Sequence, residues 1–357
     1  MINVTKTFLP SFDEYTNFLI RAWDKAWLTN NGELLQELEQ KLKAYLGVDD
    51  FLFCSNGTIV LQMAIKVLGI TKEVITTPFS YVATTNAILW EGCKPVFVDI
   101  REDSYCIDET KIEAAITEDT EAILATHVYG LPCNIEAIEA LANKYNLRVI
   151  YDAAHAFGCT YKGKSLLNYG DISTCSFHAT KLFHTVEGGC IITNNKQLNE
   201  RLYLYRSFGH IGDDYYSEGI NAKNSEFHAA MGLAVLPYMS QIIGDRKQIS
   251  KLYDSILPAF LGRPFTTESD FDYNYAYYPV VFETEEQLLL AKNALLKDEI
   301  NSRRYFYPSL NNLPQVSHLN QTCPVSENVS KRVLSLPLYP GFDQVEKVIN
   351  IIKEAVV

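Results

Sequence analysis

The chain has 357 residues, more than one hydrophobic core usually organises, which predicts about two domains. Its 47% hydrophobic and 21% charged residues are typical of a folded globular protein and exclude a disordered or fibrous chain. A formal net charge of -12 argues against a nucleic-acid partner, because binding to phosphates depends on lysine and arginine. Small-molecule chemistry is therefore favoured.

Short apolar segments bounded by turn residues alternate with longer segments of helical period, which predicts an α/β sheet covered by helices. The predicted strands are residues 51–54, 73–77, 95–99, 122–126, 148–152, 173–177 and 190–193. Between them, residues 57–67, 134–145 and 196–207 carry apolar residues at three- and four-residue spacing and are predicted helices.

The pattern changes beyond about residue 240. A long helix is followed by an aromatic strand near residues 273–282 and by helices at 285–296 and 343–357. We therefore expect a large cofactor-binding domain over residues 1–240 and a smaller domain over residues 241–357. No Pro/Gly-rich linker separates them, so the two domains should pack tightly.

The cysteines and the first residues bear on the cellular compartment. The eight cysteines form no C-x-x-C pair and no zinc-type cluster, so we expect reduced, mostly buried thiols. Residues 1–10 lack a basic stretch followed by an apolar core, and no apolar run approaches the ~18 residues that span a bilayer. We expect a cytoplasmic protein with no membrane partner.

An aspartate ends the predicted strand 148–152, in the stretch V-I-Y-D-A-A-H. Ligands of open α/β sheets bind at the carboxyl ends of strands. A buried acid at that place needs a cationic partner, because an unpaired buried charge is costly. The protonated ring nitrogen of a pyridine cofactor would pair with Asp152, whereas a helix cap is the plainer alternative.

Lys181 lies among small and apolar residues in S-F-H-A-T-K, between two predicted strands. Lysine is rarely found in such surroundings without a role. A lysine near apolar groups has a lowered basicity, which suits its reaction with a carbonyl carbon. A plain surface charge is the alternative role for a lone lysine. The presence of Asp152 at the nearby strand end makes that alternative weaker.

Two weaker motifs lie upstream. The stretch S-N-G-T at residues 55–58 joins a strand to a helix whose first turn offers amide groups to a phosphate, although a plain helix cap is the alternative. Residues 77–85 place Phe79 and Tyr81 in the loop after another strand. One of these rings can stack on a flat cofactor, or both can pack in the core.

Taken in chain order, S-N-G-T, T-P-F-S-Y-V-A-T, D-A-A-H, S-F-H-A-T-K and V-E-G-G resemble the DegT/DnrJ/EryC1/StrS family of sugar aminotransferases over nearly the whole chain. Residues 27–32 and 219–224 look like that family's substrate-side loop and dimer-interface loop. The resemblance implies the fold type I architecture of aspartate aminotransferase, with a large seven-stranded, mostly parallel sheet domain and a small C-terminal α/β domain. It also implies pyridoxal 5'-phosphate as the cofactor and a homodimer with shared active sites.

The resemblance also implies roles for individual residues. Lys181 would bond the cofactor covalently, Asp152 would pair with the pyridine nitrogen, and Tyr81 would stack on the ring. The loop before Tyr81 is one residue shorter than in many members, so Phe79 is the alternative for stacking. His155 stands where many members have a glutamine that contacts the ring hydroxyl.

The phosphate positions of the family are matched by Gly57, Thr58 and Ser176. Asn221 matches the asparagine that reaches the phosphate from the partner subunit.

The family reaction moves an amino group from L-glutamate to a keto-sugar carried on a nucleotide. The stretch S-F-H-A-T-K-L-F-H-T-V-E-G-G is most similar to a sub-group that makes dideoxyamino sugars for surface polysaccharide (O-antigen). We therefore expect dTDP-4-keto-6-deoxy-D-glucose as the acceptor, aminated at C4. Amination of a dTDP-3-keto-6-deoxyhexose at C3 is the alternative.

Other functions fit parts of the sequence. Dehydratases on the same scaffold replace the lysine by histidine, and Lys181 argues against them. A cofactor-binding sensor without turnover would form no 2-oxoglutarate from glutamate. A metal hydrolase would rest on His178, His184, Asp152 and Asp171, but the histidines are not at H-E-x-x-H spacing, so we expect no metal.

Two late segments have less specific interpretations. Residues 303–308, R-R-Y-F-Y-P, either meet a nucleotide diphosphate or form an exposed basic turn beside a packed aromatic ring. Residues 334–340 are assigned to packing.

Overall fold

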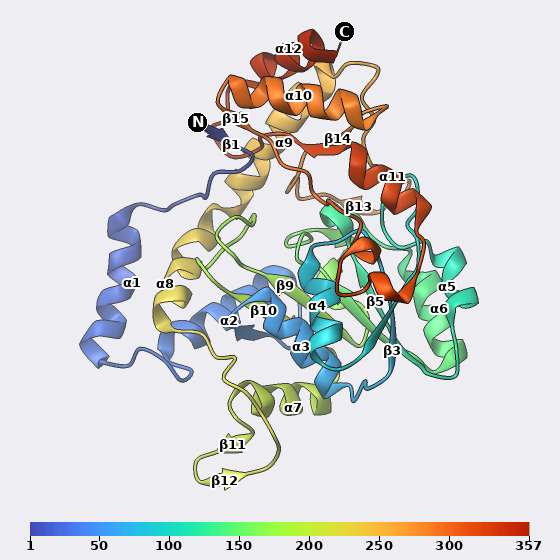
Figure 1. Ribbon diagram of the computed structural model, residues 1–357. Helices are drawn as coiled ribbons and strands as arrows, with labels where there is room; N and C mark the ends of the chain where they lie inside the picture. The colour runs from blue at the N-terminus through green and yellow to red at the C-terminus, as the bar shows by residue number, and fades with distance from the viewer. Residues whose placement is uncertain (357) are drawn as a thin grey trace.

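A seven-stranded sheet forms the centre of the molecule in a computed structural model that describes residues 1–356 (Figure 1). Its strands, in spatial order, are β2 (Leu52–Cys54), β10 (Gly189–Ile192), β9 (Ile172–Ser176), β6 (Arg148–Asp152), β5 (Thr120–Thr126), β3 (Glu73–Thr76) and β4 (Lys94–Phe97). All pairings are parallel except those of β10 with β2 and β9. All seven predicted strands are confirmed, with bounds shifted by at most two residues.

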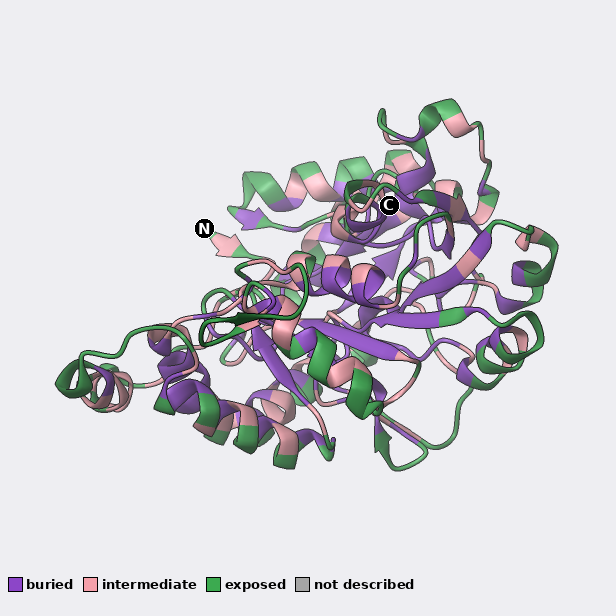
Figure 2. Ribbon diagram, turned by 90° about the horizontal axis from the view of Figure 1, so that it is seen from below, coloured by how far each residue is buried: buried purple, intermediate pink, exposed green. Residues whose placement is uncertain are grey.

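Helices cover both faces of this sheet, because successive strand residues point to opposite sides. On β6, Ile150 joins one core while Val149 and Tyr151 join the other. The first core includes residues of α3 (Gly57–Val67), α4 (Val82–Trp90) and α7 (Lys196–Arg206), and the second includes residues of α2 (Glu33–Leu46), α5 (Glu109–Ala115), α6 (Ile135–Tyr145) and α8 (Glu226–Val235). In Figure 2 the strands are buried between helices whose outer sides are exposed. The three helices predicted between the strands are confirmed.

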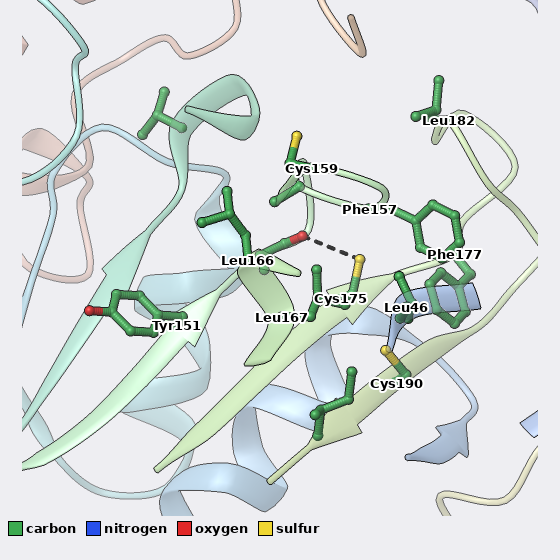
Figure 3. Close-up of a cluster of buried hydrophobic side chains, with 14 of the residues drawn as sticks. Leu46, Tyr151, Phe157, Cys159, Leu166, Leu167, Cys175, Phe177, Leu182 and Cys190 are labelled. Carbon is green, nitrogen blue, oxygen red and sulfur yellow. Dashed lines mark hydrogen bonds between the residues drawn. The ribbon is translucent and has the colours of Figure 1, made fainter. Parts of the chain in front are cut away.

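The core that contains Val149 and Tyr151 is the larger of the two, and it is rich in aromatic rings and thiols (Figure 3). Phe157 and Phe177 meet edge to face with ring centroids 5.8 Å apart. Cys175 donates a hydrogen bond from its Sγ to the carbonyl oxygen of Ala153 over 3.2 Å. All eight cysteines are free and buried, as the sequence predicts.

The carboxy-terminal part has a core of its own. It contains α9 (Met239–Ile256), β14 (Pro279–Val281), α10 (Glu285–Lys297), β15 (Ile300–Asn301), α11 (Pro324–Arg332), β16 (Val333–Ser335) and α12 (Val345–Val356), with β14 antiparallel to β16. The predicted helices of this part are confirmed over the described residues, and residue 357 lies outside them. At the other end of the sequence, β1 (Ile2–Asn3) pairs in parallel with β15, so the first residues pack against this carboxy-terminal part. A domain boundary at residue 240 stays a prediction.

The predicted aromatic strand over residues 273–282 is wrong in its length, because only Pro279–Val281 are in strand. Asn274 turns the preceding segment inward by donating hydrogen bonds to the carbonyl oxygens of His155 and Phe157, at 2.8 and 2.9 Å. Tyr275 adopts a positive φ of 55°. This irregular path carries the tyrosines of the segment toward the carboxyl end of β6.

The remaining elements are peripheral. They are α1 (Phe12–Lys25), a three-stranded sheet of β13 (Phe271–Asp272), β7 (Thr160–Tyr161) and β8 (Lys164–Ser165), and a hairpin of β11 (His210–Ile211) and β12 (Asp214–Tyr215). Figure 1 shows α1 and this hairpin extending away from the central sheet.

The helical stretch Glu226–Ile256 is long and apolar enough to cross a membrane by length and composition. It is not the uninterrupted apolar run that the expectation excludes, because Ser240, Gln241 and Asp245 interrupt it. Half of the apolar window is buried inside the protein, where the stretch packs against α1, α2 and α12. These contacts are typical of a helix in the core of a folded protein.

Candidate active site

A cavity of about 260 Å³ opens where the strands of the central sheet end. The parallel strands β3, β6 and β9 all direct their carboxyl ends toward it, which is where ligands of α/β sheets bind. Seven of the eight residues predicted for the site line this cavity: Gly57, Thr58, Tyr81, Asp152, His155, Ser176 and Lys181. The sheet topology therefore brings together residues that are up to 124 positions apart (181 minus 57).

Asp152 supplies a buried negative charge at the end of β6. Its Oδ2 accepts a hydrogen bond from the Thr84 hydroxyl at 2.8 Å, and its Oδ1 accepts one from the backbone N–H of Ala154 at 3.1 Å. Burial raises the pKa of Asp152, while these two donors and the nearby Lys181 oppose that rise. The plainer interpretation, a cap of a following helix, is wrong, because a turn and no helix follows Asp152, whose carboxylate can pair with a cation in the cavity.

Lys181 faces the same cavity from the loop after β9. Its Nζ donates a hydrogen bond to the Tyr277 hydroxyl at 3.2 Å. Burial lowers the pKa of Lys181, but Tyr277 and Asp152 raise it by more, so the net shift is upward. The predicted lowering of basicity is therefore wrong for the free side chain, because two acidic partners surround it.

The start of α3 forms a cradle for an anion. The Asn56 side chain caps this helix by accepting hydrogen bonds from the backbone N–H groups of Thr58 and Ile59, at 3.0 and 2.8 Å. Gly57 lies directly against Ser176, since a Cβ on Gly57 would sit 2.7 Å from the Ser176 Cβ. The glycine thereby brings the positive end of the helix and two hydroxyl groups into one place, which suits a phosphate.

The two aromatic candidates for stacking occupy different environments. Phe79 is 0% exposed and packs edge-on against Tyr105 and Tyr129, with centroids 5.7 and 6.2 Å apart. Tyr81 is 53% exposed and lines the cavity at the N-terminal end of α4. Only Tyr81 can reach a ligand there.

His155 is buried beside the cavity. Its Nδ1 accepts a hydrogen bond from the backbone N–H of Tyr129 at 3.2 Å, so the proton of the neutral ring is on Nε2. Burial lowers the pKa of His155, and Lys181 lowers it further. His155 is therefore a neutral donor that can hydrogen-bond a hydroxyl or phenolate oxygen.

The carboxy-terminal part covers the cavity with aromatic side chains. Tyr277, Tyr305 and Phe306 line it. The Phe306 ring stacks on His155 with centroids 5.4 Å apart and an interplanar angle of 9°. Tyr277 carries no sequence motif, so only its three-dimensional position reveals it, whereas Tyr305 and Phe306 belong to the segment 303–308.

The two arginines of the basic segment 303–308 lie in different environments. Arg303 lines the cavity, whereas Arg304 pairs with Glu285 at 2.8 Å and bonds the carbonyl oxygen of Lys331 at 2.9 Å. The packing assignment of residues 334–340 is correct for buried Leu336, but it is incomplete. Ser335, Leu336 and Leu338 also line the cavity.

Asn221 does not line the cavity of its own chain. Asn221 is exposed on the segment that follows the β11–β12 hairpin, where it forms an isolated antiparallel β-bridge with Ser207. A role for Asn221 at a phosphate thus depends on a second chain.

The histidines proposed for a metal hydrolase do not form a ligand pair. His184 is buried and donates from Nε2 to the carbonyl oxygen of Phe8 over 2.6 Å. His178 is exposed and contacts the Thr180 hydroxyl at 2.8 Å. Within residues 1–356, no three His, Cys, Asp or Glu side chains gather in a way that could hold a metal ion.

The residues present fit a phosphorylated pyridine aldehyde. The amine of Lys181 can bond an aldehyde carbon, and the Asp152 carboxylate can pair with a protonated ring nitrogen. The Gly57 cradle, which a larger side chain would fill, accommodates a phosphate.

Comparisons with known proteins agree with this chemistry. Residues 13–353 match the model of the DegT/DnrJ/EryC1/StrS aminotransferase family. A dTDP-4-amino-4,6-dideoxy-D-glucose transaminase of Escherichia coli is 41% identical over 99% of this chain and 97% of its own length. A protein of the same name from Shigella dysenteriae is 39% identical, over 99% of this chain and 98% of its own. The crystal structure of DesI in the presence of its TDP-sugar product has a TM-score of 0.90 and 29% identity, covering 97% of this chain and 90% of that one.

Proposed function

Because the chain belongs to the DegT/DnrJ/EryC1/StrS aminotransferase family, whose members use pyridoxal phosphate, we propose that it aminates C4 of dTDP-4-keto-6-deoxy-D-glucose with L-glutamate as donor. The substrate assignment rests on the full-length similarity to two transaminases named for dTDP-4-amino-4,6-dideoxy-D-glucose. Amination at C3 of a dTDP-3-keto-6-deoxyhexose is the alternative within the same chemistry.

Four contacts would hold the cofactor ring. Lys181 would bond it covalently, and Asp152 would keep the ring nitrogen protonated. Tyr81 would stack on the ring face, and the Nε2–H of His155 would donate to the ring hydroxyl oxygen. Bound pyridoxal phosphate supplies a pyridine ring that accepts negative charge when a C–H bond at the amino-bearing carbon breaks.

Phosphate binding would fix the other end of the cofactor. Gly57 lets the start of α3 approach closely, and Thr58 and Ser176 add hydroxyl donors. A negatively charged phosphate is stabilised at this helix N-terminus by the helix dipole.

Lys181 would move the proton of the reaction. Its amine, once free, would take the proton from Cα of glutamate in the first half of the reaction and deliver one to C4 of the sugar in the second. Tyr277 lies within hydrogen-bonding distance of this amine and holds it in the cavity. Tyr305 and Phe306 line the cavity and would limit the access of water to the reacting atoms once cofactor and substrate are bound.

Arg303 supports a substrate that carries a diphosphate. Its guanidinium lies 4.8 Å from the centroid of the Tyr305 ring and lines the cavity, whereas the neighbouring Arg304 is engaged by Glu285. An arginine placed there matches the oxygen atoms of a nucleotide diphosphate.

A homodimer with shared active sites is also part of the proposal. Large apolar side chains are exposed on α1 and on the β11–β12 hairpin, including Phe12, Trp23 and Tyr215. Such patches mark interaction surfaces. In a symmetric pair, Asn221 of one chain would reach the phosphate in the other. We place this enzyme in the cytoplasm, in the synthesis of an amino sugar for O-antigen polysaccharide.

The test is incubation of the purified protein with pyridoxal phosphate, L-glutamate and each nucleotide-linked keto-sugar, followed by NMR of the product. We expect the new amine at C4 of the dTDP-6-deoxyhexose, with one 2-oxoglutarate formed for each amino sugar. An amine at C3 would overturn the regiochemistry. Cofactor binding without formation of 2-oxoglutarate would identify a sensor instead.

A further inference from the structure

A chain of three buried hydroxyl groups ends on the carboxylate of Asp152. The Thr84 hydroxyl donates to Asp152 Oδ2 over 2.8 Å. The Ser80 and Thr84 oxygens are 2.7 Å apart, and the Thr126 hydroxyl donates to the Ser80 oxygen over 3.2 Å. All three hydroxyl-bearing residues are at most 2% exposed.

The proton positions in this chain follow from the chemistry of its members. An ionised carboxylate only accepts, so the single hydroxyl proton of Thr84 must point at Asp152. The contact between Ser80 and Thr84 must then use the proton of Ser80, which leaves the Ser80 oxygen to accept from Thr126. The three O–H bonds are therefore aligned toward one charge, and aligned hydrogen bonds strengthen one another.

We propose that Thr84, Ser80 and Thr126 are positioning residues that hold Asp152 ionised and aimed at the ring nitrogen of the cofactor. The proposal rests on the proposed function, since it concerns the group that would keep that nitrogen protonated. Thr84 reaches Asp152 from the first turn of α4, Ser80 lies in the loop before that helix, and Thr126 ends β5. Three elements thus fix one carboxylate.

The alternative is that the hydroxyl groups only satisfy one another in the core. The geometry argues against this alternative, because the chain ends on a charged group that faces the cavity. Burial raises the pKa of Asp152, and the Thr84 hydrogen bond is the largest influence that opposes the rise. Without that donor, Asp152 would take up a proton at a higher pH.

The other titratable groups near Asp152 come from three places. Lys181, from the loop after β9, favours the ionised carboxylate. His155, on the segment that follows β6, is kept neutral by burial. His127, at the end of β5, donates its backbone N–H to the carbonyl oxygen of Asp152, and its pKa is lowered to about 3 by burial, so its ring is neutral. Lys181 is therefore the one cation among these groups.

The experiment uses the full-length protein loaded with pyridoxal phosphate. Thr84→Val removes the donor, Thr84→Ser restores it, and Thr85→Val is the matched control. Thr85 is the next residue of the same helix, is equally buried, and its hydroxyl has no hydrogen-bond partner within residues 1–356. For each protein, the dissociation constant of the cofactor and the pH dependence of its visible absorption and of the glutamate half-reaction are measured.

In Thr84→Val we expect the acid limb of both pH profiles to move up by about one pH unit, since a hydrogen bond to a charged group is worth about a tenfold factor or more. Cofactor affinity should fall by a similar factor. Thr84→Ser should show the same pH profiles as the unaltered protein, and Thr85→Val should show no shift. Should Thr84→Val fail to fold, Ser80→Ala, one step further along the chain, should show a smaller shift in the same direction.

An unshifted profile in both Thr84→Val and Ser80→Ala, or an equal shift in Thr85→Val, would overturn the hydroxyl-chain proposal while leaving the aminotransferase function intact. Failure of the unaltered protein to bind pyridoxal phosphate is the separate result that would overturn the proposed function.

Discussion

The Lys181 Nζ donates a hydrogen bond to the Tyr277 hydroxyl over 3.2 Å, joining residues that are 96 positions apart in sequence. Lys181 follows a strand of the central sheet, and Tyr277 precedes the first strand of the carboxy-terminal part. The amine that would carry the cofactor is thus positioned from both parts of the molecule.

Replacing Tyr277 by phenylalanine should lower the pKa of Lys181, because the hydroxyl contributes to its upward shift. More of the amine is then unprotonated at a given pH, so the apoprotein should attach pyridoxal phosphate covalently at lower pH. One lost hydrogen bond predicts a displacement of up to about one pH unit. Absorbance of the attached cofactor against pH gives the midpoint, and a midpoint displaced upward would contradict the assigned contact.

Asp152→Asn should keep the hydrogen bond from Thr84 but lose the charge. Breaking a buried charge pair costs about 3–5 kcal/mol, which corresponds to a half-reaction with glutamate that is roughly 150- to 5000-fold slower. Stopped-flow absorbance measures that rate directly. A variant that reacts within tenfold of the unaltered protein would show that Asp152 is not the partner of the ring nitrogen.

Phe79→Ala should mainly lower stability, whereas Tyr81→Ala should mainly weaken cofactor binding. The buried Phe79 packs against core rings, so its truncation should lower the free energy of unfolding by about 3–5 kcal/mol. The half-exposed Tyr81 should affect stability little, while the loss of stacking weakens cofactor binding by up to about tenfold. Urea unfolding and cofactor titration separate the two effects, and the reverse pattern would assign stacking to Phe79.

Gly57→Ala should weaken cofactor binding, because the added Cβ would lie 2.7 Å from the Ser176 Cβ and push α3 away from Ser176. We expect at least a tenfold higher dissociation constant for pyridoxal phosphate, about 1.4 kcal/mol of binding free energy.

The matched control is Gly244→Ala on α9, where an added Cβ meets nothing within 4 Å. This control should bind the cofactor normally and gain up to about 1 kcal/mol of stability from its helix propensity. Equal binding by the two variants would mean that the Gly57 cradle does not hold the phosphate.

Much of the sheet could be predicted from the sequence, because the seven apolar segments and their turn residues are local features. The same local pattern identifies Asp152 at a strand end and Lys181 in an unusual small-residue loop. Their proximity follows from the parallel order of β6 and β9, since carboxyl ends of parallel strands share one edge.

Contacts between distant segments could not be predicted in this way. Thr84 meets Asp152 across 68 positions, and nothing near either residue indicates the other. The upward pKa shift of Lys181 depends on Tyr277, which comes from a segment that was predicted to be a longer strand. The sequence of the loop leaves open whether Phe79 or Tyr81 stacks on a cofactor, because only tertiary packing decides which ring is buried.

Identification of the lysine that bonds the cofactor is the most direct measurement. The protein is mixed with pyridoxal phosphate, reduced with borohydride, digested and mapped by mass spectrometry. We predict a single labelled peptide that carries the modification on Lys181, and loss of both label and turnover, by at least ~100-fold, in Lys181→Ala. A label on another lysine of the active protein, or turnover that survives in Lys181→Ala, would contradict the central role of Lys181.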